Sequence, residues 1–95
     1  MADQVTRPTI SNVTMTNADT EYSLLLPVNT QKVLIKTRSG AADIKLAYIS
    51  GASGTAYITI HAGATKYLEG AWLKQVTLYF QSPTAAQVLE VESWA

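Results

Sequence analysis

The chain consists of short runs in which apolar and polar side chains alternate, separated by turn-forming residues. This two-residue period puts successive side chains on opposite faces of an extended strand. The runs recur at about the 8–12-residue spacing that is typical of β-sandwiches and barrels. The expected strands are residues 10–16, 20–26, 32–37, 43–49, 56–60, 66–69, 76–81 and 88–94. Since no segment keeps a helical period over a full window, the sequence predicts an all-β fold.

Each run has one mainly apolar face, which indicates two antiparallel sheets packed on a common core. About eight strands favour a sandwich of Greek-key or jelly-roll type. The last two runs, 76–81 and 88–94, flank a short connection containing Pro83 and are expected to pair as a β-hairpin. The expected core is Leu24, Leu26, Ile35, Ile44, Leu46, Ile58, Ile60, Leu78, Phe80, Leu89 and Val91.

Length favours a single domain, because 95 residues are enough for one hydrophobic core. We expect an extended N-terminal arm over residues 1–9 and one sandwich domain over residues 10–95. The arm is polar, and Pro8 favours extended backbone at Arg7, so we expect the arm to lie along a neighbouring subunit or to add to a sheet edge. The first residues lack the apolar segment of a signal peptide, and no run reaches the roughly 20 apolar residues that cross a bilayer. The sequence therefore predicts synthesis in a cytoplasm and no membrane partner.

The amino-acid composition limits the kinds of partner that the chain can bind. Seven basic and seven acidic residues cancel, so no basic field exists for nucleic acid, and none is expected to bind. Without cysteine there is neither a disulfide nor a cysteine-based zinc site. Only 15% of residues are charged against 47% hydrophobic. Such a chain leaves apolar surface exposed, which favours residence in an assembly.

Few residues have side chains that could catalyse a reaction or bind a metal or phosphate. Glu90 and Glu92 lie two apart on one strand face, where solubilising charges are a simpler interpretation than a glycosidase pair. His61 is the only histidine and has no cysteine or second histidine as a co-ligand. Residues 51–55 lack the lysine and the following helix of a phosphate loop and read as a hairpin loop. We expect no catalytic residue, no metal, no cofactor and no enzymatic activity.

Aromatic residues are the better candidates for partner contact. Tyr57 and Tyr79 alternate outward among small polar side chains, and Trp72 lies in a connection. Such rings can bury against another protein subunit, stack on a sugar, or simply pair across strands. The residues expected to bind a partner are Arg7, Tyr57, Trp72, Tyr79 and Trp94.

From about Thr20 onward the chain resembles small β-sandwich structural proteins of tailed bacteriophages. The resemblance is carried by residues 21–23 (EYS), 26–30 (LPVNT), 32–38 (KVLIKTR), 43–48 (DIKLAY), 57–60 (YITI), 77–82 (TLYFQS) and 88–94 (VLEVESW). It implies a non-enzymatic virion protein, with a capsid decoration (cement) protein as the first expectation. Such a protein binds the major capsid protein and copies of itself, as a dimer or trimer, at the capsid surface. A small tail or head–tail accessory protein, and a carbohydrate-binding module, remain alternatives.

Overall fold

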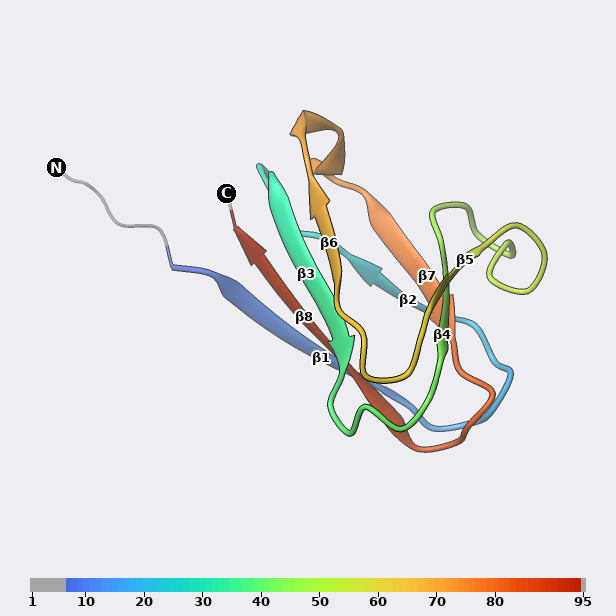
Figure 1. Ribbon diagram of the computed structural model, residues 1–95. Helices are drawn as coiled ribbons and strands as arrows, with labels where there is room; N and C mark the ends of the chain where they lie inside the picture. Colours follow the sequence, from blue (N-terminus) through green and yellow to red (C-terminus); the bar gives the residue numbers. More distant parts are fainter. Residues whose placement is uncertain (1–6, 95) are drawn as a thin grey trace, which may run out of the picture.

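The computed structural model describes residues 7–94, which form eight strands and one short 3-10 helix (Figure 1). The elements are β1 (Thr9–Met15), β2 (Tyr22–Leu25), β3 (Lys32–Thr37), β4 (Ile44–Ala47), β5 (Ile58–Ile60), β6 (Lys66–Glu69), η1 (Ala71–Leu73), β7 (Thr77–Gln81) and β8 (Gln87–Trp94). The predicted all-β fold is confirmed, and β3 and β6 have the predicted bounds. The expected arm lies largely outside the described residues; β1 begins at Thr9, one residue earlier than expected.

The strands form two antiparallel sheets that lie in two layers (Figure 1). Sheet A has the order β1-β8-β3-β6, and sheet B has the order β2-β7-β4-β5. Within them β1 pairs with β8, β2 with β7, β3 with β6 and β4 with β5. The chain is therefore one long hairpin of four strand pairs, wrapped so that β3–β8 and β4–β7 contacts join the pairs into sheets. This is the topology of a jelly roll, one of the two types expected.

The expected hairpin between the last two strands is wrong. β7 pairs with β2 and β4 in sheet B, whereas β8 pairs with β1 and β3 in sheet A. The connection crosses between the layers, held where Asp19 N donates to Ser82 O and Ala86 N donates to Met15 O. Alternation shows which face of a strand is apolar, but it does not show which strand lies beside it. Here the apolar faces of β7 and β8 meet across the core.

The core lies between the layers and includes nearly all the side chains expected there. Its buried members are Met15, Leu26, Val33, Ile35, Ile44, Leu46, Ile60, Leu68, Leu73, Leu78, Phe80, Leu89 and Val91, and Leu24 packs partly buried against them. Ile58 was expected in the core, yet its side chain is 44% exposed. It pairs with Leu46 and so lies on the same face, but β5 is an edge strand and leaves one side uncovered.

The contrast between Leu78 and Ile58 is a direct test of the sheet order. Leu78 has no exposed surface, so Leu78→Ala should cost about 2–5 kcal/mol of unfolding free energy through lost burial and a cavity. Ile58→Ala, at the edge, should cost less than about 1 kcal/mol. Urea unfolding of both variants measures the difference. Equal losses would contradict the edge position of β5.

Candidate functional site

The five residues expected to bind a partner are spread over three surfaces. Tyr57 and Tyr79 belong to the outer face of sheet B. Trp94 ends β8 on the outer face of sheet A, and Arg7, which is exposed, lies two residues before the start of the neighbouring strand β1. Trp72 lies in η1, which joins β6 of sheet A to β7 of sheet B. The structure thus does not unite them in one site, and each surface has to be judged by its own geometry.

On sheet B the two tyrosines differ in their surroundings. Tyr57 is 41% exposed, and Lys45 Nζ lies 5.0 Å from the centre of its ring. Tyr79 is half-buried and pairs with Ser23 on one side and Ala47 on the other. Both side chains therefore take part in cross-strand packing, which is the simplest of the interpretations left open by the sequence.

Trp72 is exposed and yet held in one orientation. Its side chain is 51% exposed, while its Nε1 donates a hydrogen bond of 3.1 Å to Glu69 O. The ring of Tyr48 meets it edge to face, with centroids 5.5 Å apart and planes at 89°. Tyr48 directly follows β4 and is itself 41% exposed, and partial burial raises the pKa of its hydroxyl. We call this pair of rings the Trp72 cluster.

Gly70 makes the position of the Trp72 ring possible. A Cβ atom at residue 70 would lie 2.7 Å from Trp72 Cδ1 and 2.9 Å from Nε1, closer than any side chain tolerates. Gly70 also has a φ of 135°, which side chains rarely adopt. The Gly-Ala-Trp segment that follows β6 was a usable sequence signal for this arrangement. Tyr48, in contrast, was not among the residues expected to bind a partner.

The loop between β4 and β5, which begins at Tyr48, is anchored by a carboxylate. Gly51 N donates to Glu21 Oε2 at 2.8 Å, and both the N–H and the hydroxyl of Ser53 donate to Oε1. Gln81 Nε2 in turn donates to Ser53 Oγ at 3.0 Å. These hydrogen bonds lower the pKa of Glu21, led by the one from the Ser53 hydroxyl. Glu21 thereby holds the middle of the loop, which joins the paired strands β4 and β5 and is the hairpin loop that the sequence predicted.

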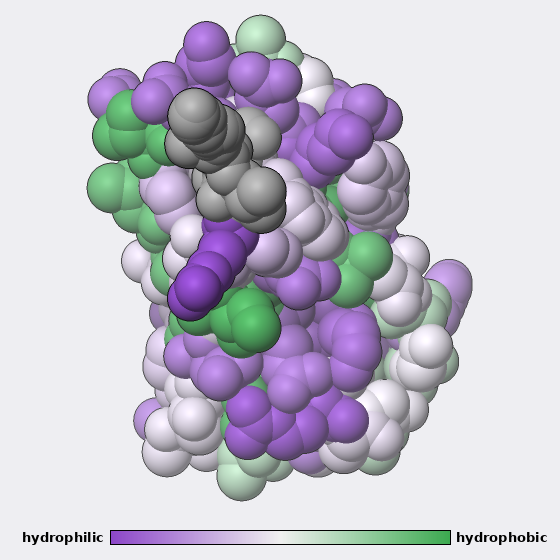
Figure 2. Space-filling model, turned by 90° about the vertical axis from the view of Figure 1, so that its left-hand side faces the viewer, coloured by the Kyte–Doolittle hydropathy of each residue, from purple (hydrophilic) through white to green (hydrophobic). Residues whose placement is uncertain are grey.

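The outer face of sheet A is a mixed surface with a shallow hollow. Figure 2 views the side of the molecule on which this sheet lies and shows apolar patches separated by hydrophilic side chains. The hollow has a volume of about 210 Å³ and is lined by Ile10, Leu34, Lys36, Glu90, Val91 and Glu92. Its floor follows β8, and its two walls come from β1 and β3.

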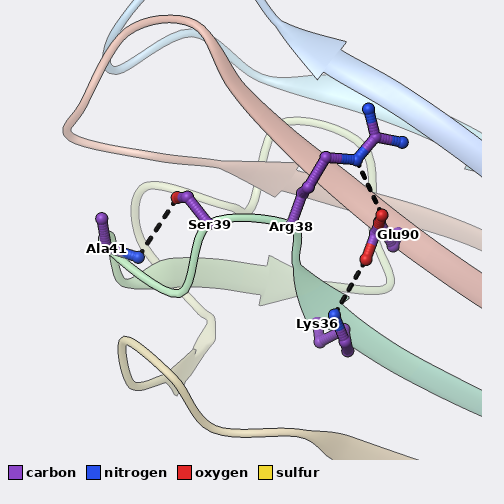
Figure 3. Close-up of polar contacts among 5 residues, drawn as sticks. All are labelled: Lys36, Arg38, Ser39, Ala41 and Glu90. Carbon is purple, nitrogen blue, oxygen red and sulfur yellow. Dashed lines mark hydrogen bonds and ion pairs between the residues drawn. The ribbon is translucent and has the colours of Figure 1, made fainter.

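Glu90 is bound by two cations on this face (Figure 3). Lys36 Nζ lies 2.9 Å from one carboxylate oxygen, and Arg38 Nε lies 2.7 Å from the other. Both hydrogen bonds, with that from Lys36 the larger, lower the pKa of Glu90. A carboxylic acid that donates a proton to a glycoside needs a raised pKa, so Glu90 is arranged as a structural charge.

His61, at the end of β5, is exposed. Among residues 7–94 no three histidine, cysteine or acidic side chains come close enough together to hold a metal ion. Within the same residues, no helix has the length and hydrophobicity needed to cross a membrane. Comparison of the chain with protein-family models, curated proteins and solved structures found no match.

The Gly70–Trp72 contact can be tested in a Trp94→Phe background, where Trp72 is the sole tryptophan. Gly70→Ala should displace the indole, shift its fluorescence and weaken the near-ultraviolet dichroism of the Trp72 cluster. Gly51→Ala is the matched control, since Gly51 also has a positive φ, of 83°, but nothing lies within 4 Å of its added Cβ. An unchanged spectrum in Gly70→Ala would contradict the described packing.

Proposed function

We propose that this chain is a non-enzymatic virion structural protein of a tailed bacteriophage, a capsid decoration subunit that binds and stabilises the major capsid shell. The observation that carries the proposal is the amount of large apolar side chain left in solvent. Among residues 7–94, nine such side chains are between 41% and 71% exposed: Ile10, Leu25, Val28, Tyr48, Ile49, Tyr57, Ile58, Tyr67 and Trp72. On a chain of zero formal net charge, surface of this kind suits contact with other proteins.

The Trp72 cluster is the proposed contact with the shell. Binding normally costs conformational entropy as side chains are fixed at the interface. Trp72 avoids most of this cost because its hydrogen bond to Glu69 O and its contact with Tyr48 hold the ring beforehand. Tryptophan and tyrosine are also the residue types that most often dominate interface energy.

The choice of a capsid as the partner rests on resemblance and on topology. The segments from residue 21 onward resemble small structural proteins of tailed phages, and the jelly roll recurs in viral capsid proteins. The topological argument is an analogy, because one fold serves many functions. Decoration needs no chemistry: a subunit that binds only the expanded shell stabilises it by mass action.

Two alternatives have specific support. Jelly rolls also occur in lectins, and a fixed, exposed indole beside a tyrosine is a surface on which a sugar can stack. A small tail or head–tail accessory protein would use the same apolar surfaces against other virion proteins. Copy number separates this last possibility from decoration, since a decoration subunit is present in numbers comparable with the major capsid protein.

Co-sedimentation with expanded, undecorated shells of the phage that encodes the chain tests the proposal. The wild type should saturate the shells, and Trp72→Ala should lose at least tenfold in affinity because it removes the anchoring ring. Ile10→Ala is the control, because Ile10 is 68% exposed on β1, at the opposite edge of sheet A from β6 and the Trp72 that follows it, and should bind as the wild type does.

Two results would overturn the decoration proposal. One is the failure of the wild type to bind the shells. The other is retention by a glycan array that depends on Trp72, which would favour the carbohydrate-binding module.

A further inference from the structure

The two central strands of sheet A present opposite charges to solvent. On β8 the alternate residues Leu89, Val91 and Ser93 are buried, so the carboxylates of Glu90 and Glu92 face outward. On β3 the buried residues are Val33, Ile35 and Thr37. The outward side chains there are Lys32, Leu34 and Lys36, and Arg38 follows directly. The outer face therefore carries an acidic column on β8 beside a basic column on β3.

Strand register arranges this face in rows. Glu92 pairs with Ile10 on β1 and with Leu34 on β3, and Leu34 pairs with Tyr67 on β6. The next row toward the end of β8 contains Trp94, Lys32 and, on β6, Glu69, and the next row in the other direction contains Glu90 and Lys36. Apolar side chains thus lie at both outer edges of the central row, on β1 and on β6.

We infer that two copies of this chain associate through sheet A, face to face, about a two-fold axis that runs parallel to the strands between β8 and β3. That axis places β8 of each copy over β3 of the other, and β1 over β6. The acidic column of each copy then meets the basic column of the other. Such self-complementarity is what a two-fold interface between identical subunits requires.

In this dimer, acidic and basic side chains of the two copies alternate across the interface. Within one chain Glu90 already lies between Lys36 and Arg38, so this group of three carries one surplus positive charge (Figure 3). Across the axis, Glu90 of one copy faces Lys36 of the other. The same operation brings the indole of Trp94 over the ammonium group of Lys32, a favourable pairing of a cation with an aromatic ring.

The apolar residues at the two edges of the face are matched by the same operation. Ile10, which is 68% exposed, meets Tyr67, which is 48% exposed. Leu34 of each copy lies over Glu92 of the other, where the hollow between Ile10 and Leu34 can receive the leucine while the carboxylate stays at its rim. An axis perpendicular to the strands would instead stack β8 on β8 and set carboxylates against carboxylates. Electrostatic repulsion therefore disfavours the perpendicular axis, and the axis parallel to the strands is the arrangement that we infer.

The size of the face limits the strength of the association. Four strands spaced about 4.8 Å apart give a width of roughly 20 Å, and the eight residues of β8, the longest strand, span about 26 Å. The face therefore measures roughly 500 Å², less than the approximately 800 Å² that each partner buries in a standard interface. The dimer should be weak and reversible, and salt should weaken it further by screening the charge columns. It does not depend on capsid binding and would form in the isolated protein.

Charge exchange tests the arrangement by sedimentation equilibrium, from micromolar to millimolar protein at low salt. The wild type should show reversible dimerisation that falls as salt is added. Lys32→Glu/Lys36→Glu makes both columns acidic, and Glu90→Lys/Glu92→Lys makes both columns basic, so each variant alone should be monomeric. An equimolar mixture of the two variants should dimerise again, because every acidic column then faces a basic one. Misfolded variants would not recover association on mixing.

The control is Lys45→Glu/Lys74→Glu, which makes the same change in net charge as Lys32→Glu/Lys36→Glu but outside the strands of sheet A, and it should dimerise as the wild type does. A wild type that stays monomeric at the highest concentration, a mixture that stays monomeric, or a control that loses association would each overturn the inference. If either charge variant loses its circular-dichroism spectrum, the uncharged Tyr67→Ser variant carries the test. Undiminished dimerisation of Tyr67→Ser would then contradict the arrangement.

Discussion

The pairing of β8 on both sides holds this structure together. β8 lies between β1 and β3, and through them it joins the first and third strands of the chain into one sheet. Its inward side chains Leu89 and Val91 belong to the core, and its outward carboxylates belong to the surface. A single extended segment therefore determines both how the core closes and how charge is distributed outside it. β7 has the corresponding central place in sheet B.

Because the core is thin, some apolar side chains remain exposed at the surface. Two layers of four short strands bury one set of alternating side chains, and the four edge strands leave part of that set uncovered. Ile58 on β5 shows this most clearly, since it shares a face with Leu46 but remains in solvent. Trp72 is exposed for a different reason, because Gly70 and Glu69 hold its ring outside the core. Apolar surface thus arises from the fold itself and also from specific local contacts.

Local patterns predicted the elements, but they did not predict their neighbours. The two-residue period located all eight strands and gave β3 and β6 their bounds, because alternation depends only on the strand itself. Sheet order depends on contacts between distant segments, so the β7–β8 hairpin and the burial of Ile58 were wrongly predicted. The partner-binding residues remain predictions. Their types and outward positions could be read from the sequence, but the hydrogen bond that fixes Trp72 required coordinates.

The central claim is that the chain acts through preformed surface contacts while its core stays unchanged. Amide hydrogen exchange, measured with and without bound expanded shells, tests this most directly. Exchange should slow in residues 48–58 and 69–74, which carry and support the Trp72 cluster, and should remain unchanged in the interior strands β7 and β8. Slowing that is absent from both segments, or faster exchange throughout β7 and β8, would contradict the claim.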